Sequence, residues 1–385
     1  MASHRTGILP LLAILFLAAA SVVAQEAVVS PEVLPGGRVV FRHVDPRATR
    51  VELLGRSPDK GHDFPENSYD LVRGAGDVWE TTVGPLLPGL YLYRFRIDGT
   101  EAVDPLNGSV QNFFAGPWSK VEVPDPQPRS WHPRPDVPAG RVEIRRFGRE
   151  AVGWGRPVCV YLPAGYDTMT AKLPVVYLLH GWDYDERAWI DNGLVPTILD
   201  NLIAGGRARP MVVVMPLGFS IVPTGRFEWP GNENERWTKQ LLEGLVPWIE
   251  ANYRVATGRE HRAVAGLSMG GKQSLLLGLG RPELFAWVGC FSSGKQSLAN
   301  YEAGEFQPAM KSDAPKLRLV WLGSGQGDLH FDKGKQVAQK LKADGLPVVW
   351  HEVDGRHTWR VWRECFSEFS QAVFQPAPQP PAGGH

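Results

Sequence analysis

The sequence has little cysteine, and neither sign of charge is in excess. Of its 385 residues only three are cysteines, Cys159, Cys290 and Cys365, and each lies among apolar residues far from the other two. Their spacing fits no metal site, and an odd number leaves at least one thiol unpaired, so we interpret all three as small buried apolar side chains. Lys and Arg total 41, as do Asp and Glu. A nucleic-acid partner, which requires a basic surface, is therefore not expected.

Long apolar runs are also scarce, and the longest lies at the start of the chain. His4 and Arg5 precede an apolar stretch from Ile8 to Ala20, and small residues then lead to Ala24. This pattern is typical of a secretory signal peptide, and the stretch is short for a membrane span. We therefore predict a signal peptide over residues 1–24, and a secreted or periplasmic protein with no stable membrane anchor. The alternative is an uncleaved N-terminal anchor.

Short segments rich in Val, Tyr, Trp and Phe follow between residues 25 and 123, among them "GRVVFRHV", "DVWETTV" and "GLYLYRFRID". Gly and Pro separate them, as in an antiparallel β-sandwich of the immunoglobulin type. Four aromatic residues alternate within these segments: Trp79, Tyr91, Tyr93 and Phe95. They either pack in the core of the sandwich or form a surface for a sugar, and we favour the core.

After residue 123 the composition and the spacing of apolar residues change. Residues 124–141 are rich in proline, which predicts a stiff linker. Over residues 142–374, apolar runs such as "LPVVYLLHG", "MVVVMPLG" and "HRAVAGLS" alternate with helical segments. This alternation predicts an α/β domain with a mostly parallel, doubly wound sheet. The tail, residues 375–385, is predicted to be disordered.

One short motif in the α/β region points to catalysis. Residues 266–270 read G-L-S-M-G, between an apolar run and a helical segment. A serine in G-x-S-x-G at a strand-to-helix turn forms a nucleophile elbow, so we predict that Ser268 is a nucleophile. The backbone N–H of Met269 is then one donor of an oxyanion hole. The second donor is expected after "VVYLLHG", from Trp182 or its neighbour Gly181, whereas His180 is expected to hold the loop.

A serine nucleophile needs a base and an orienting carboxylate, which follow it along the chain in this fold class. His357 lies between a predicted strand and the last helix, so we predict that it is the base; His330 is the alternative. Asp328 follows the predicted strand "LRLVWL" and is the predicted acid, with Asp332 as the alternative.

A long polar and aromatic segment, "GFSIVPTGRFEWPGNENERW", lies between a predicted strand and a predicted helix. Long loops of this kind are often functional. We predict that Phe227, Trp229 and Asn232 line the substrate pocket. The alternative is a loop that simply packs over the sheet.

With these residues placed, the α/β region resembles a known family. The segments "VYLPAGYD", "LPVVYLLHGWDYDERAW", "HRAVAGLSMGG" and "GRHTWRVW" resemble, in matching order, the esterase D-like branch of the α/β-hydrolases. That branch contains the feruloyl and acetyl xylan esterases of carbohydrate esterase family 1 and esterases of siderophore lactones. The resemblance implies Ser268 as nucleophile, Asp328 as acid and His357 as base. One departure is Trp182 and the two residues after it, where the family commonly has more glycine.

The N-terminal region resembles an early-set domain grouped with carbohydrate-binding module family 48, on the segments "DVWETTVGPLLPGLYLYRFRIDG" and "DPLN". The resemblance leaves a glycan contact by this domain open.

The sequence therefore predicts an exported serine carboxylesterase that needs no cofactor and no metal. The expected substrates are acyl or aryl esters on plant cell-wall polysaccharide, or small esters of the same kind. A siderophore trilactone esterase, an acyltransferase and an inactive hydrolase fold that binds glycan are the alternatives. The sequence does not define the acyl group, the sugar or the oligomeric state. Because all candidate catalytic residues follow residue 142, we expect the α/β domain to hydrolyse small esters without the sandwich.

Overall fold

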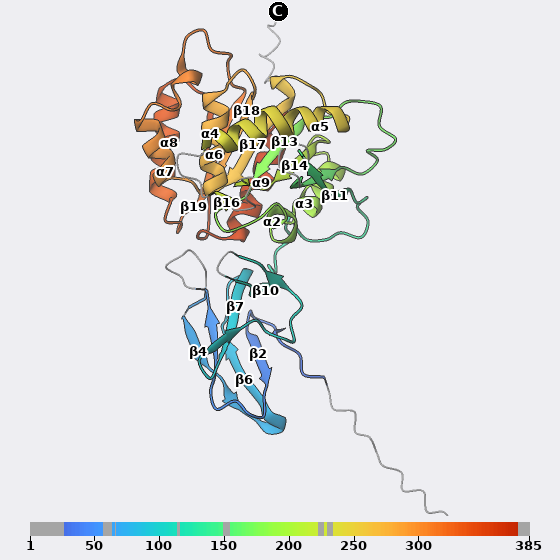
Figure 1. Ribbon diagram of the computed structural model, residues 1–385, viewed down its shortest axis with the longest axis vertical. Helices are drawn as coiled ribbons and strands as arrows, with labels where there is room; N and C mark the ends of the chain where they lie inside the picture. Colours follow the sequence, from blue (N-terminus) through green and yellow to red (C-terminus); the bar gives the residue numbers. More distant parts are fainter. Residues whose placement is uncertain are drawn as a thin grey trace, which may run out of the picture.

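The computed structural model describes residues 27–56, 64–65, 67–113, 116–148, 155–221, 227–228 and 234–375; for 220–221, 227–228 and 234–236 it describes the backbone alone. The chain forms a small β lobe and a larger α/β lobe (Figure 1). The predicted signal peptide and nearly all of the predicted tail lie outside the described residues. None of the helices within these ranges is long and apolar enough to cross a membrane.

Two antiparallel sheets form the N-terminal lobe. One contains, in order, β1 (Glu32–Val33), β2 (Val39–Val44), β6 (Val78–Val83) and β5 (Val72–Arg73). The other contains β4 (Ser68–Asp70), β3 (Val51–Gly55), β7 (Gly89–Ile97), β10 (Trp118–Val123) and β9 (Val110–Gln111), with β8 (Thr100–Ala102) paired to β7. A 3₁₀ turn, Ala75–Asp77, precedes β6.

The aromatic residues of this lobe fill its core. Trp79 and Tyr91 are 7% and 3% exposed, and Tyr93 and Phe95 are fully buried. The core interpretation of these four side chains is therefore confirmed, and none of them offers a flat surface to a sugar.

Eight strands form the sheet of the larger lobe, in the order β11 (Arg141–Phe147), β12 (Arg156–Leu162), β14 (Val212–Pro216), β13 (Val175–Leu179), β17 (Arg262–Leu267), β18 (Trp287–Phe291), β19 (Leu319–Gly325) and β20 (Val348–Val353). Strand β12 runs antiparallel to both neighbours, whereas β14, β13, β17, β18, β19 and β20 run parallel to one another. A separate hairpin joins β15 (Ser220–Ile221) to β16 (Phe227–Glu228). The predicted α/β fold is confirmed.

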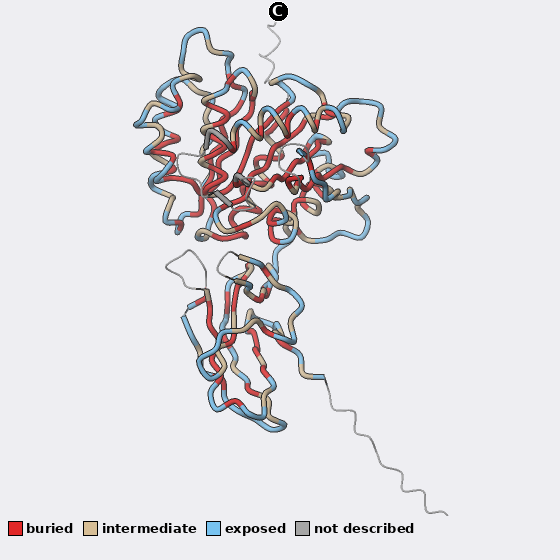
Figure 2. The backbone as a smooth tube through the Cα atoms, in the orientation of Figure 1, coloured by how far each residue is buried: buried red, intermediate tan, exposed pale blue. Residues whose placement is uncertain are grey.

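Helices cover both faces of this sheet. They are α2 (Ala188–Asp191), α3 (Val195–Ala204), α4 (Asn234–Lys239), a π-helical segment (Gln240–Leu245), α5 (Val246–Asn252), α6 (Met269–Gly280), α7 (Lys295–Glu302), α8 (Phe331–Ala343) and α9 (Trp359–Ala372), with 3₁₀ turns at Arg259–His261 and Gln307–Met310. Buried residues run through the centre of the lobe (Figure 2). The two layers leave every residue of β13, β14, β17 and β18 buried, which explains their continuous apolar sequences.

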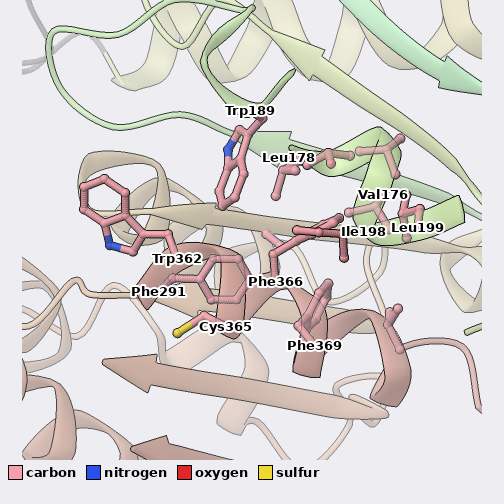
Figure 3. Close-up of a cluster of buried hydrophobic side chains, with 14 of the residues drawn as sticks. Val176, Leu178, Trp189, Ile198, Leu199, Phe291, Trp362, Cys365, Phe366 and Phe369 are labelled. Atoms are coloured by element: carbon pink, nitrogen blue, oxygen red, sulfur yellow. The ribbon is translucent and has the colours of Figure 1, made fainter. Parts of the chain in front are cut away.

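The core on one face lies between β13, α3 and α9 (Figure 3). Leu178 of β13, Ile198 of α3 and Phe366 of α9 are all fully buried there. Cys365 belongs to the same cluster, and all three cysteines are free and buried. Burial raises the pKa of each thiol, to about 12 for Cys159 and Cys290. The cysteines are small apolar core residues, as predicted.

The proline-rich segment between β10 and β11 is docked on the α/β lobe. Trp131 is 5% exposed and belongs to the core of that lobe. Asn201 of α3 donates hydrogen bonds to the carbonyl oxygens of Ser130 and His132, at 2.7 and 2.9 Å. The prolines stiffen the segment, and Trp131 anchors it, so it is part of the surface of the domain and not a free spacer.

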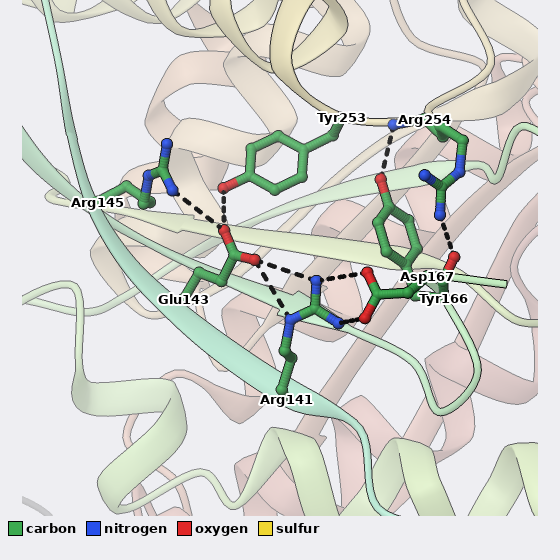
Figure 4. Close-up of polar contacts among 7 residues, drawn as sticks. All are labelled: Arg141, Glu143, Arg145, Tyr166, Asp167, Tyr253 and Arg254. Carbon is green, nitrogen blue, oxygen red and sulfur yellow. Dashed lines mark hydrogen bonds and ion pairs between the residues drawn. The ribbon is translucent and has the colours of Figure 1, made fainter. Parts of the chain in front are cut away.

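Ion pairs fasten the outermost strand, β11, to the lobe (Figure 4). Arg141 makes a two-pronged contact with Asp167, at 2.7 and 2.9 Å. Glu143 pairs with Arg141 and Arg145, and its other contact is a hydrogen bond from the hydroxyl of Tyr253 at 3.0 Å. Because these side chains satisfy one another, we interpret the cluster as structural.

Candidate active site

Ser268 lies at a sharp turn between β17 and α6. Its φ of 51° and ψ of −114° are strained for a residue with a side chain. A Cβ atom added at Gly270 would come within 2.5 Å of the carbonyl oxygens of Leu179 and His180, and one at Gly266 within 2.6 Å of the backbone of Gly270. The two glycines of the motif are therefore required by close packing of the backbone around the serine. This is the geometry of a nucleophile elbow.

The other two predicted members of the site lie at the ends of neighbouring parallel strands. Asp328 follows β19, and His357 follows β20. The carboxylate Oδ2 of Asp328 lies 2.9 Å from Nδ1 of His357, and its Oδ1 accepts the backbone N–H of His330 at 2.8 Å. The Asp328 side chain is fully buried and that of His357 is 14% exposed. Since β17 to β20 are parallel, Ser268, Asp328 and His357 share one edge of the sheet.

The ionisation of Asp328 suits an orienting role. Burial by itself would raise its pKa, but the hydrogen bond and charge of His357, with the N–H of His330, outweigh burial and hold the pKa below its usual value. An ionised Asp328 accepts a hydrogen bond from the Nδ1–H of His357. The Nε2 atom of the imidazole is then the one available to act as a base.

The structure separates the predicted residues from their alternatives. Asp332 is exposed in the first turn of α8, where it does not pair with His357. The ring of His330 lies 5.1 Å from that of His357, and burial, followed by the charge of His357, lowers the pKa of His330 to about 4. It is Asp328, not Asp332, that contacts His357.

The loop after β13 lies against Ser268; we call residues 181–184 the oxyanion loop, after the oxyanion donor that the sequence predicts in it. A Cβ atom at Gly181 would be 3.5 Å from Cβ of Ser268. His180 holds this loop: its Nδ1–H donates to the carbonyl of Gly181 at 2.8 Å, and its Nε2 accepts the N–H of Gly218 at 2.7 Å. Burial lowers the pKa of His180 to about 4, so the ring is neutral near pH 7.

The predicted donors border the same turn. Met269 is the first residue of α6, and the first N–H groups of a helix have no partner within it. Trp182 belongs to the oxyanion loop, and its side chain is 47% exposed. Of the predicted pocket residues, Phe227 lies in β16, where the structure describes the backbone alone, and Trp229 and Asn232 lie outside the described residues. Their role stays a prediction.

Two neighbours of the site were not anticipated from the sequence. The ring of Trp362 packs edge-on against His357, with 4.8 Å between centroids. Asp183, in the oxyanion loop, has a φ of 71° and pairs with Arg56 of the sandwich at 3.6 Å. The aromatic richness of the segment after His357 was visible in the sequence, whereas the pair between Asp183 and Arg56 joins distant segments and has no local signal.

A mostly parallel eight-stranded sheet with a serine elbow and an Asp–His pair at one edge defines an α/β-hydrolase fold. Residues 149–372 match the family model described as putative esterase, and the chain belongs to this family. Residues 26–119 match the model of carbohydrate-binding module 48, described as the isoamylase N-terminal domain.

Three similar proteins illustrate the likeness. An endo-1,4-beta-xylanase/feruloyl esterase of Xylanibacter ruminicola is 32% identical over 316 residues, which is 79% of this chain but 41% of that protein. The chain thus spans less than half the length of that relative. A ferulic acid esterase of Anaeromyces mucronatus, solved with ferulic acid, is 25% identical with a TM-score of 0.55, over 64% of this chain and 96% of that one. The enterobactin esterase of Shigella flexneri is 20% identical with a TM-score of 0.63, over 88% of this chain and 93% of that one.

Proposed function

We propose that this protein is a serine carboxylesterase in which Ser268 is the nucleophile, His357 the base and Asp328 the orienting acid. The observation that carries the proposal is the 2.9 Å contact between Asp328 and His357 at the sheet edge that also bears the strained Ser268. Membership of the putative esterase family supports the same reaction.

The reaction has two halves. His357 Nε2 takes the proton of Ser268 as Oγ attacks the ester carbonyl, and the backbone N–H groups of Met269 and Trp182, or Gly181 in its place, stabilise the oxyanion. The intermediate collapses, His357 returns the proton to the leaving alcohol, and an acyl-serine remains. Water then attacks the acyl group with His357 as base, and the carboxylic acid leaves.

We infer acyl or aryl esters on plant cell-wall polysaccharide as the substrate class. The names of the xylanase/feruloyl esterase relative and of the ferulic acid esterase structure support this class. Trp182, which follows Gly181 in the loop against Ser268, is half exposed and offers an apolar surface to an aryl group or a sugar ring. The carbohydrate-binding-module match supports a glycan contact by the sandwich, outside the four core aromatics. We further propose that the protein is exported, on the strength of its N-terminal sequence.

A trilactone esterase is the second candidate, because the enterobactin esterase matches the fold of both lobes. We would measure hydrolysis of p-nitrophenyl acetate, methyl ferulate and a catecholate trilactone by the full chain and by Ser268→Ala. The proposal expects turnover of the first two, a loss in Ser268→Ala, and one adduct with an organophosphate on the peptide that contains Ser268. Preference for the trilactone would favour the second candidate. A wild type that is inactive and forms no organophosphate adduct would favour an inactive hydrolase fold that binds glycan. Acyl transfer faster than hydrolysis would favour an acyltransferase.

A further inference from the structure

A partly buried polar network joins the sandwich to the α/β lobe. Arg363 of α9 is 2% exposed, and its two terminal nitrogens contact the carboxylate of Glu122 in β10 at 2.6 and 3.0 Å. Its Nε donates to the carbonyl of Asn192 at 2.7 Å. The side chain of Asn192 in turn donates to Gln111 at 2.6 Å and accepts from Lys120 at 2.9 Å. Glu122 itself is 41% exposed, but its charge-assisted pair with Arg363 and the hydrogen bonds to the buried Asn192 tie the two lobes together.

Within this fixed arrangement, the sandwich contacts the oxyanion loop. Arg56, the first residue after β3, pairs with Asp183 at 3.6 Å, and the two side chains are only 20% and 16% exposed. Asp183 directly follows Trp182, the proposed second oxyanion donor. Its φ of 71° is a left-handed conformation, which aspartate tolerates better than most residues but which is still less favourable than an ordinary one.

A second contact joins the sandwich to the same loop. The guanidinium of Arg56 stacks 4.1 Å above the ring of Phe113, and Phe113 packs against Tyr184 with 5.4 Å between centroids. Tyr184 is the last residue of the oxyanion loop. Its hydroxyl accepts a hydrogen bond from Nε1 of Trp359, at 3.1 Å, in the helix that follows His357.

We propose that the sandwich is a working part of the catalytic centre: Arg56, supported by Phe113, positions the oxyanion loop, so that even small soluble esters need the sandwich for full turnover. This inference rests on the proposed function. It replaces the expectation that the α/β domain alone suffices for such esters. Arg56 is a positioning residue, since it acts through Asp183 and not on the substrate.

The alternative is a sandwich that only tethers the protein to glycan. If the sandwich were only a tether, a substitution at Arg56 would leave the turnover of small esters unchanged. The ion pair with Asp183 would then add only a little to folding stability, as surface ion pairs do. An oxyanion donor, by contrast, contributes about 10²- to 10³-fold to turnover, and a donor displaced by a fraction of an ångström loses part of that contribution.

The experiment compares Arg56→Ala and Asp183→Asn with Arg50→Ala in the full chain. Arg50 serves as the control because it lies at the opposite end of β3 and pairs, at 3.0 Å, with Asp70 of the same lobe, away from the α/β lobe. With p-nitrophenyl acetate we expect kcat to fall about tenfold in the first two variants, with KM changed by less than about twofold. The double variant should fall no further than the lower single one, because both remove the same contact. Arg50→Ala should match the wild type.

A second readout separates positioning from general destabilisation. Ser268 adds to the carbonyl of a trifluoromethyl ketone, and the product places an oxyanion in the oxyanion hole. The affinity for this inhibitor should therefore weaken in Arg56→Ala by the same factor as kcat. Loss of stability without displacement of the loop would lower the unfolding midpoint and leave this affinity unchanged.

Wild-type kcat and inhibitor affinity in a folded Arg56→Ala would overturn the inference, as would a loss equal to that of Arg50→Ala. If Arg56→Ala does not fold, Asp183→Asn decides, since it removes the charge with almost no change in shape. A wild type that hydrolyses no ester, or an active Ser268→Ala, would instead remove the proposed function.

Discussion

Acid should lower the stability of the protein, because His180 is buried beneath the oxyanion loop as a neutral ring. Burial lowers the pKa of His180 to about 4, whereas a histidine in the unfolded chain titrates near ~6.5. Between these values the unfolded state binds more protons than the folded state, so the free energy of unfolding falls as the pH falls. From pH 8 to pH 5 this group alone should remove about 2 kcal/mol, and below pH 4 about 3 kcal/mol.

The variant His180→Gln tests this reasoning. A glutamine amide does not titrate, yet it can accept the N–H of Gly218 and donate to the carbonyl of Gly181, as the imidazole does. Urea unfolding, followed by tryptophan fluorescence, should show that the difference in unfolding free energy between pH 8 and pH 5 is about 2 kcal/mol smaller in His180→Gln than in the wild type.

The control is His261→Gln, an exposed residue at the N-terminal end of β17, which should keep the wild-type difference. Equal differences in His180→Gln and the wild type would refute the assignment of a buried neutral ring. So would a His180 resonance that titrates near ~6.5 in the NMR spectrum of the folded protein.

Three further predictions concern the proposed triad. Ser268→Ala should lower hydrolysis of p-nitrophenyl acetate by at least ~10³-fold while the circular dichroism spectrum stays unchanged; near-normal turnover would remove the nucleophile assignment. His357→Ala should be nearly as damaging, and the double variant with Ser268→Ala little worse; inactivation by His330→Ala, with an active His357→Ala, would transfer the role of base. Asp328→Asn should cost up to ~10⁴-fold in kcat, because it favours the wrong tautomer of His357, and Asp332→Asn should be mild; the reverse order would reassign the acid.

The architecture of the α/β lobe was predictable because its signals are local. Strands buried on both faces need apolar runs, and "VVYLL" and, after Arg262, "AVAGL" are such runs between helical segments. The elbow was predictable because its motif lies within five residues, although the backbone that Gly270 must avoid belongs to the distant Leu179 and His180.

The sequence favoured Asp328 over Asp332 but could not decide between them, since both follow β19. Only the fold shows that the Asp328 carboxylate, and not that of Asp332, contacts His357. The contacts between lobes were not predictable, because Arg56 and Asp183 are remote in sequence. One signal did exist. Arg363 occupies the apolar face of α9, between Trp359 and Phe366, and a charge at such a position implies a partner of opposite charge.

That buried arginine also bears on how such a protein can evolve. An exchange of the sandwich for one from another gene would remove Glu122 and leave the guanidinium of Arg363, which is 2% exposed in the intact protein, without its counter-charge. Because Glu122 is 41% exposed, the loss is smaller than the about 3–5 kcal/mol typical of a fully buried pair, but it still counts against the small net stability of an ordinary domain. Recombination between relatives would therefore succeed mainly when it transmits the two lobes as one inherited block. In a lineage, Glu122 and Arg363 should be gained and lost together.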